Sequence, residues 1–310
     1  MIPIKYPGKT VMAEIKYEYK NIFGDTSKKN IEFYSLCERE KKKLGKYKKL
    51  SIEDLLVMPF DEIAKMAPCF RESNIPNVFE SLKEILVYTP SHQRKISNLF
   101  MRYADKLKIS SCYFCNIDYV NVFEVKKNSF KNNFTLDHML SKAKNPLFSL
   151  SFYNFIPSCY TCNSKLKRDF EFIDSESEAY LSPSSKDFSF DENVEFKVFL
   201  NSEKDDFSFK DVKCFDMKLV DKSGNDKYKL YIEKFYLEER YQFHKNTVKE
   251  IILKLVKYGG NGKDSYLKDF NKSDAEFIKD MMGREIFEGE LNSRSLTKLK
   301  RDIYLAFKKS

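Results

Sequence analysis

Cys112-Tyr113-Phe114-Cys115 and Cys159-Tyr160-Thr161-Cys162 are the two stretches that decide how this chain folds. Each has two cysteines separated by two residues, and such a turn can direct two thiolates at one ion. Two turns of this kind complete the tetrahedron that zinc prefers. We therefore predict that these four cysteines bind one structural zinc ion, which joins the two ends of a small module.

The alternative interpretation of the same residues is a set of buried or redox-active thiols. A redox pair of the thioredoxin type needs a strand–helix–strand context, and neither cysteine pair has one. The chain has seven cysteines, an odd number, so a disulfide scaffold is not expected. Cys37, Cys69 and Cys214 are predicted to be buried thiols outside the metal site.

The composition excludes several classes of protein. The chain has 310 residues, of which 42% are hydrophobic and 33% charged, and this balance is typical of globular proteins. Its apolar runs are too short to cross a bilayer, and its first residues lack the apolar core of a secretion signal. We expect a cytoplasmic protein without a membrane partner. The formal net charge of +9 is a weak indication of a polyanionic partner.

The residue pattern predicts an α+β fold that is mostly helical. Residues 1–108 form a helical N-terminal region, residues 109–170 form the module with the cysteine pairs, and residues 171–310 form a C-terminal α+β region. In the last region we expect a hairpin with strands at 212–220 and 227–235, because Ser223-Gly224-Asn225-Asp226 suits a tight turn. One long amphipathic helix is expected at 236–258.

Within the module, Asp137 and His138 lie side by side at the end of a predicted strand at 134–136. Further strands are predicted at 117–125 and 154–157, and a helix at 160–170. A carboxylate is a hard oxygen ligand, and a histidine with a pKa near ~6.5 is largely neutral at cellular pH and can take a proton. The alternative is an ordinary histidine near a surface carboxylate. Adjacent strand residues point to opposite faces, so a shared site requires the strand to end or twist here.

Asn163 directly follows the second cysteine pair and begins a basic run. In a helix, Asn163 and Lys167 lie on one face. The side chains of Lys165, Lys167 and Arg168, together with a helix N-terminus, suit a phosphate group of a nucleic acid. Taken alone, Asn154 and Asn163 would be turn or cap residues.

Taken together and in this order, these residues resemble an HNH endonuclease domain of the subtype whose ββα-metal core carries a four-cysteine zinc. The resemblance covers residues 112–168. The family pattern often has a histidine at the place of Asn163, whose amide oxygen can also bind a hard cation. The resemblance is carried by Cys112-x-x-Cys115, Leu136-Asp137-His138, Asn154-Phe155-Ile156-Pro157-Ser158-Cys159 and Cys162-Asn163-Ser164-Lys165.

The resemblance implies a role for each of these residues. His138 would be the general base that activates water, and Asp137 and Asn163 would hold one divalent cation, Mg²⁺ or Mn²⁺. Asn154 would hydrogen bond across the loop and fix the orientation of His138. The four cysteines would bind zinc for structure only.

The activity that the resemblance implies is metal-dependent hydrolysis of phosphodiester bonds in DNA. Leu237-Glu238-Glu239-Arg240-Tyr241 and the nearby His244 are similar to the C-terminal part of HNH nuclease subunits from Septu-type and retron-associated anti-phage systems. Those subunits often work beside an ATPase, so we expect an effector of bacterial defence with an ATPase partner. The alternative is a zinc-stabilised nucleic-acid-binding or regulatory subunit that acts only with the ATPase.

Overall fold

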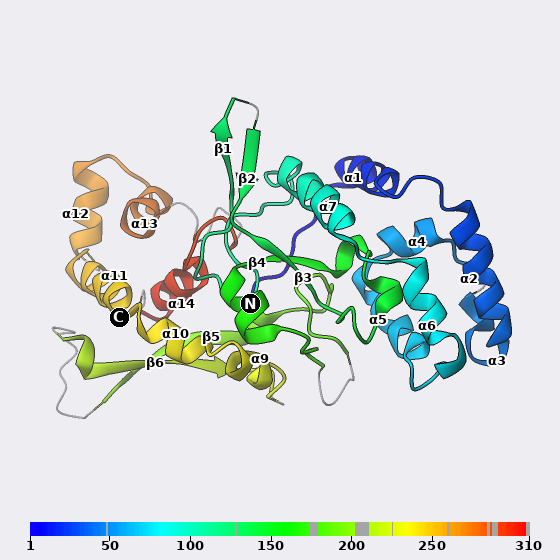
Figure 1. The fold of residues 1–310 in the computed structure, drawn as a ribbon. Coiled ribbons are helices and arrows are strands. Elements are labelled where there is room, and N and C mark those ends of the chain that lie inside the picture. Colours follow the sequence, from blue (N-terminus) through cyan, green and yellow to red (C-terminus); the bar gives the residue numbers. More distant parts are fainter. Residues whose placement is uncertain are drawn as a thin grey trace. The chain divides into compact units, whose positions relative to one another are not determined.

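The computed structural model describes residues 1–47, 49–127, 129–173, 179–201, 211–224, 226–258, 261–283, 286 and 291–307. Within these ranges the fold is α+β and mostly helical, as predicted, with three two-stranded sheets (Figure 1). No helix in the same ranges combines the length and the apolar composition needed to cross a membrane. The chain forms two compact units. The N-terminal unit comprises Pro3–Ile109 and Val120–Phe188, and the C-terminal unit comprises Met1–Ile2, Ser110–Tyr119 and Ser189–Ser310.

Helices make up most of the N-terminal unit, and local sequence sets several of their ends. Ser51 and Asp54 form a reciprocal capping box at the start of α4, and Thr89 caps α7, whose first residue is a proline. The α-helices are α1 (Lys9–Asn21), α2 (Ser27–Arg39), α3 (Lys41–Leu44), α4 (Ile52–Val57), α5 (Phe60–Met66), α6 (Pro76–Ile85) and α7 (Pro90–Arg102). Two short 3₁₀-helices follow α3 and α5, namely η1 (Gly45–Tyr47) and η2 (Ala67–Phe70).

The strands of the N-terminal unit form two antiparallel hairpins. In the first, β1 (Val122–Lys126) pairs with β2 (Ser129–Asn132). In the second, β3 (Thr135–His138) pairs with β4 (Phe155–Ser158). The second hairpin lies where the sequence predicts strands, because β-branched and aromatic residues fit a pleated, half-buried surface.

The segment around the second hairpin completes a strand–strand–helix order. Two 3₁₀-helices, η3 (Pro146–Phe148) and η4 (Phe152–Asn154), lie in the connection between β3 and β4. After β4 the chain enters η5 (Thr161–Lys167), which is a π-helix. Single-turn π-helices are rare and occur frequently at functional sites. The predicted helix at 160–170 is therefore present, with an unusual hydrogen-bond pattern.

An aromatic cluster around the fully buried Phe152 forms the centre of the N-terminal unit. Phe100 of α7 stacks on Phe152 with ring centres 5.1 Å apart, and Tyr19 of α1 packs edge-on at 5.3 Å. Tyr19 Oη also donates a hydrogen bond to the carbonyl oxygen of Leu150 at 2.7 Å. These contacts fix α1 and α7 on the connection between β3 and β4.

The C-terminal unit contains one hairpin and several helices. Strand β5 (Val194–Leu200) pairs with β6 (Phe215–Asp221) in antiparallel register. The helices are α8 (Phe190–Asn193), η6 (Val212–Cys214), α9 (Lys229–Lys234), α10 (Leu237–Gln242), α11 (Lys245–Tyr258), α12 (Asn261–Asp269), α13 (Asp274–Met282) and α14 (Thr297–Phe307).

Two secondary-structure predictions for the C-terminal unit are wrong. The segment 227–235 contains helix α9 instead of a strand, and β6 pairs with β5. The buried residues Tyr228, Tyr231 and Phe235 follow helical spacing, and a strand would place the first two on opposite faces. The predicted helix at 236–258 is interrupted between α10 and α11, where no glycine or proline marks the break.

Candidate active site and metal centre

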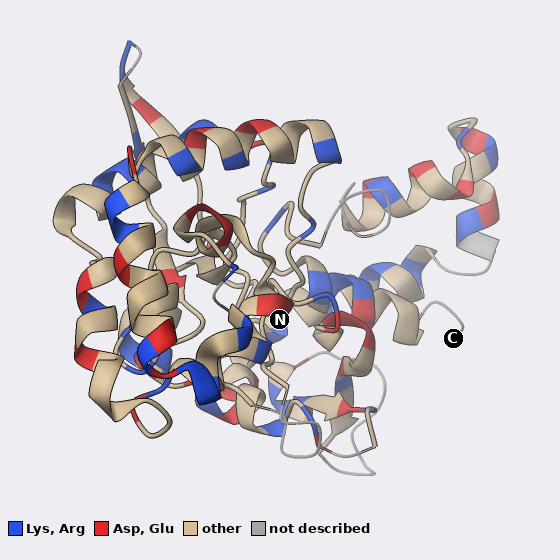
Figure 2. Cartoon of the chain, turned by 90° about the vertical axis from the view of Figure 1, so that its right-hand side faces the viewer, with Lys and Arg blue, Asp and Glu red and all other residues tan. Residues whose placement is uncertain are grey.

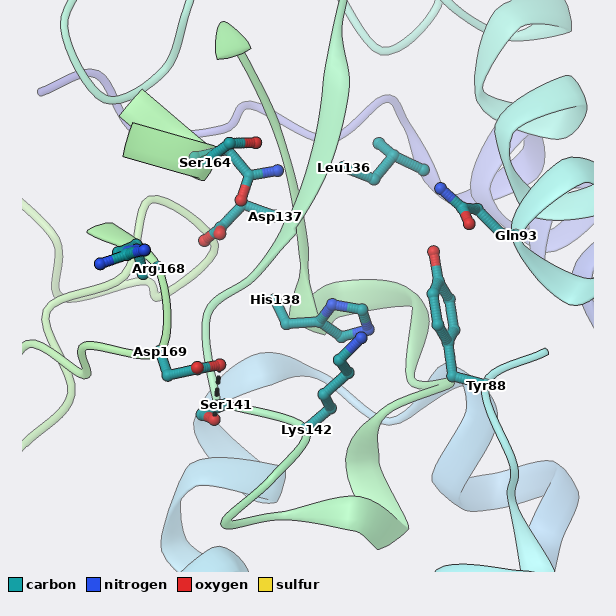
Figure 3. A pocket seen from close by; sticks show the side chains of 11 residues that line it. Tyr88, Gln93, Leu136, Asp137, His138, Ser141, Lys142, Ser164, Arg168 and Asp169 are labelled. Carbon is teal, nitrogen blue, oxygen red and sulfur yellow. Dashed lines mark hydrogen bonds between the residues drawn. The ribbon is translucent and has the colours of Figure 1, made fainter. Parts of the chain in front are cut away.

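The β3–β4 hairpin presents Asp137 and His138 to one cavity of about 350 Å³ in the N-terminal unit (Figure 3). In the ladder, Asp137 is paired with Ile156 and His138 with Phe155. His138 is the last residue of β3, so the strand ends where the sequence requires it for both side chains to share a site. The cavity is also lined by Tyr88, Gln93, Leu136, Ser141, Lys142, Asn163, Ser164, Arg168 and Asp169.

The surroundings of His138 fix its tautomer and its ring orientation. Nε2 lies 2.9 Å from the carbonyl oxygen of Ser149. A carbonyl only accepts hydrogen bonds, so Nε2 carries the proton and Nδ1 has the free lone pair. The ring packs against Tyr88 and Phe155, with centres 4.8 Å away in both cases.

Electrostatics keep His138 neutral. Burial lowers the pKa of His138 to about 4, and the nearby ammonium groups of Lys142 and Lys167 act in the same direction. The hydrogen bond to Ser149 opposes this shift. At neutral pH the imidazole is therefore uncharged, which is the form that accepts a proton.

Asp137 is a buried carboxylate with a buried counter-charge. Its Oδ2 lies 2.9 Å from Nζ of Lys167, and both side chains are almost inaccessible to solvent. Oδ2 has no well-aligned hydrogen bond, so this close ion pair is its main polar contact. Burial raises the pKa of Asp137 to about 6, although the charge of Lys167 opposes the shift.

Lys167 contacts both candidate catalytic residues. Besides the ion pair with Asp137, its Nζ donates to the carbonyl oxygen of His138 at 2.7 Å. Its side chain is directed into the protein and not to solvent. Of the three basic residues predicted to contact phosphate, Lys165 and Arg168 are exposed, and Arg168 lines the cavity.

Asn154 is fully buried and holds the loop that follows His138. Its Oδ1 accepts from the backbone N–H of Leu140 at 2.7 Å, and its Nδ2 donates to the carbonyl oxygens of Leu140 and Phe148 at 3.1 Å each. All of these bonds span the connection between β3 and β4. The side chain thereby fixes the path of the chain directly after His138.

Asn163 lies in the first turns of η5 and lines the same cavity as Asp137. The cavity therefore offers the carboxylate of Asp137, the amide of Asn163 and the carboxylate of Asp169. Oxygen donors of this kind suit Mg²⁺ or Mn²⁺, which are bound in proteins by few side chains and several waters. The cavity thus holds oxygen donors of the kind that a hard divalent cation takes, and the ammonium group of Lys167 already lies 2.9 Å from Oδ2 of Asp137.

Four buried cysteines form a second cluster that could hold a metal ion such as zinc. The sulfur atoms of Cys112, Cys115, Cys159 and Cys162 all lie within 4.8 Å of one another. In a tetrahedral site with Zn–S bonds of about 2.3 Å, the sulfur atoms are about 3.8 Å apart, so the observed spacing is suitable. All cysteines of the chain are thiols, with no disulfide among the described residues.

In each cysteine turn, a backbone N–H group points at a sulfur atom, as in turns whose thiolates bind a metal ion. The N–H of Ile117 points at Cys115 Sγ, and the N–H of Cys162 points at Cys159 Sγ, both at 3.4 Å. Nη2 of Arg240 also lies 3.4 Å from Cys115 Sγ. These donors offset the negative charge that four thiolates would bring to a zinc ion.

The other three cysteines lie outside this cluster. Cys37 is buried, as predicted, and burial raises its pKa to about 11. Cys69 and Cys214 are only half-buried. Neither of them belongs to the group of four sulfur atoms.

Several residues around the two sites were not anticipated from the sequence. Tyr88 and Ser149 hold the ring of His138, Lys167 has a structural instead of a surface role, and Arg240 supports a cysteine. Asp169 is a further lining residue that the sequence could have indicated, because this carboxylate lies only six residues after Asn163.

The comparisons with known proteins assign neither a family nor a function to this chain. No family model matches the chain, and neither the curated proteins nor the solved structures contain a match. The argument for a function therefore rests on the residues of the two clusters.

Proposed function

We propose that the chain is a metal-dependent endonuclease of the HNH type that hydrolyses phosphodiester bonds of DNA. The observation that carries the proposal is the shared cavity of Asp137, His138 and Asn163, with Asn154 holding the intervening loop. A neutral base, hard oxygen donors and exposed cations at one cavity are the groups that phosphodiester hydrolysis needs.

The residues divide the work of the reaction. Nδ1 of His138 takes a proton from the attacking water, since Nε2 is occupied by Ser149. Asp137 and Asn163 would hold the divalent cation, which supplies positive charge next to the scissile phosphate. Arg168, which lines the cavity, and the exposed Lys165 would bind the backbone of the substrate.

The cysteine cluster has a separate role in the proposal. A zinc ion bound by four thiolates has no open position for substrate or water, so it stabilises the fold and does not react. An effector role in bacterial defence and an ATPase partner remain predictions from the resemblance of residues 237–241.

Cleavage of supercoiled plasmid and of short DNA duplexes in Mg²⁺ or Mn²⁺ tests the proposal. The wild type should nick DNA, EDTA should stop the reaction, and His138→Ala should lower the rate by roughly 10²- to 10⁴-fold because the general base is lost. His244→Ala is the matched control, because His244 does not line the cavity. Cleavage by His138→Ala at the rate of the control would refute the mechanism.

A further inference from the structure

A groove of about 950 Å³ lies between α7 and the β1–β2 hairpin of the N-terminal unit, apart from the cavity of His138. Figure 1 shows the hairpin projecting beside α7, and Asn132 Nδ2 donates to Ser97 Oγ at 3.0 Å to hold the two together. The lining is more apolar than polar. It comprises Ile22, Lys95, Asn98, Met101, Arg102, Ala104, Asp105, Val122 and Phe130.

The hairpin supplies an exposed aromatic side chain to this groove. Phe130 of β2 is 53% exposed, so its ring is accessible to a ligand. Lys126 and Lys127 lie at the tip of the hairpin and are exposed, and Figure 2 shows this tip in blue. Phe130 is paired in register with Glu124, and the two lysines lie further along the same hairpin. An exposed aromatic ring with cations nearby is a combination that binds unpaired nucleic-acid bases and their phosphates.

Helix α7 supplies a polar stripe to the opposite wall of the groove. Lys95, Asn98 and Arg102 are spaced three and four residues apart, so they lie on one face of the helix. Arg102 is paired with Glu18 at 2.6 Å, and Asp105 is an acidic member of the lining, so Lys95 is the main cation for a ligand on this wall.

The same helix connects the groove with the candidate active site. Gln93, in the first turn of α7, lines the cavity of His138, whereas Lys95, Asn98 and Arg102 line the groove. Lys95 and Arg102 are about 10 Å apart along the helix axis. A strand that leaves the cavity along α7 therefore reaches the groove within a few nucleotides.

We propose that this groove binds an unpaired stretch of the DNA substrate, with a base stacked on Phe130 and a phosphate bound by Lys95. The proposal rests on the nuclease function above and adds a substrate preference to it. A volume of this size is in the range of sites for small ligands, roughly 300–1,000 Å³, so the groove has room for a nucleotide. Stacking on Phe130 requires a base that is not already stacked within a duplex. Lys95 in the lining and Lys126 and Lys127 at the hairpin tip supply positive charge for the nucleic-acid backbone.

The absence of tryptophan from the chain allows a direct test of base stacking. Phe130→Trp in a His138→Ala background gives a protein with a single tryptophan in the groove that does not consume its ligand. Titration with a single-stranded oligothymidylate should quench the emission of this tryptophan, and a blunt duplex of the same length should not. Phe199→Trp in the same background is the control, because Phe199 is 44% exposed on β5 of the other unit.

The affinity of the groove is measured with substitutions of its two contact residues. Phe130→Ala should raise the Kd for the single strand roughly 5- to 150-fold, as expected for the loss of one stacked base. Lys95→Ala should lower the slope of log K against log salt by about 0.7, the value for one lost phosphate contact on a single strand. Lys28→Ala on α2 is exposed, lies outside the groove and should leave both quantities unchanged.

Three results would overturn the groove proposal. The first is binding of the oligonucleotide, measured by fluorescence anisotropy, without quenching of the tryptophan introduced at position 130. The second is equal quenching by the duplex. The third is an unchanged Kd for both groove variants. Plasmid nicking by the wild type and its loss in His138→Ala are measured separately. They decide the nuclease function independently of where an unpaired strand binds.

Discussion

Asp137 and His138 are neighbours in the chain, but different partners set their chemistry. Burial keeps His138 neutral, and the carbonyl of Ser149 holds its proton on Nε2, so the lone pair of Nδ1 is free. Asp137 is kept near Lys167, whose ammonium group compensates part of the cost of burying a carboxylate. The charge and the orientation of the two side chains therefore follow from their surroundings.

The buried ion pair gives the first prediction at this scale. Lys167→Met should lower the free energy of unfolding by about 3–5 kcal/mol, because it leaves the carboxylate of Asp137 buried without a partner charge. Urea denaturation measures the change. Lys165→Met, two residues away and exposed, should change stability by less than about 0.5 kcal/mol. Equal stabilities of the two variants would contradict the role given to Lys167.

A second prediction concerns Asn154. Asn154→Ala leaves the N–H and the carbonyl of Leu140 without their side-chain partner, whereas the carbonyl of Phe148 still accepts from the N–H of Ser151 at 3.1 Å. Each unsatisfied buried group costs about 1–3 kcal/mol, so the variant should be destabilised by at least about 2 kcal/mol. Thermal or chemical unfolding monitored by circular dichroism gives the value. A loss below about 0.5 kcal/mol would show that the loop does not depend on this side chain.

At the scale of elements, the hairpin β3–β4 and the helix after it are the parts that sequence patterns predict best. Phe134-Thr135-Leu136 and Phe155-Ile156 have the β-branched and aromatic residues of strands, and Thr135-Leu136 lies in β3 and Phe155-Ile156 in β4. The predicted strand 227–235 is a helix because the packing of Tyr231 and Phe235 on Phe114 decides its conformation. The turn sequence at 223–226 carries no information on this contact, which involves a residue far away in the chain.

Helix α1 provides a prediction for the pH dependence of stability. Tyr19→Phe removes the hydrogen bond to Leu150 and should cost about 1–3 kcal/mol at pH 7. Burial raises the pKa of Tyr19 well above its usual value near ~10, so the folded phenol stays protonated while the unfolded phenol ionises. The free energy of unfolding of the wild type therefore falls as the pH rises through ~10, because the unfolded phenol ionises. The phenylalanine variant has no phenol at this position, so its free energy of unfolding lacks this contribution.

The measurement for this prediction is the difference in unfolding free energy between wild type and Tyr19→Phe at several pH values. The difference should be constant from pH 7 to about 9 and should shrink above pH ~10. A difference that stays constant up to pH 11 would contradict the inference that the buried phenol resists ionisation.

At the scale of the whole molecule, the sequence predicts the candidate site residues but not the groups that support them. The two cysteine pairs, Asp137, His138 and the asparagines are recognisable because their spacing is local. Tyr88 and Ser149 reach His138 from elements distant in the chain, and no periodic pattern marks them. Such contacts are set by tertiary packing, which a single sequence does not display.

The cysteine cluster gives a prediction for the complete chain. Protein purified without chelator should contain one zinc per chain, and Cys159→Ser should lose the metal and unfold at lower temperature, since structural zinc contributes folding free energy. Atomic emission spectroscopy and a thermal melt measure the two effects. Cys214→Ser, outside the cluster, should retain the zinc. Wild-type protein without zinc and with unchanged melting in a strong chelator would contradict the assignment.

The central claim is that His138 acts as the general base of a metal-dependent nuclease. The most direct measurement is the single-turnover rate of plasmid nicking in Mg²⁺ by wild type and His138→Ala, each with and without added imidazole. We predict that the variant is slower by roughly 10²- to 10⁴-fold and that imidazole restores part of its rate, because a free base can occupy the space of the missing ring. An equal rate for the two proteins without imidazole would contradict the claim.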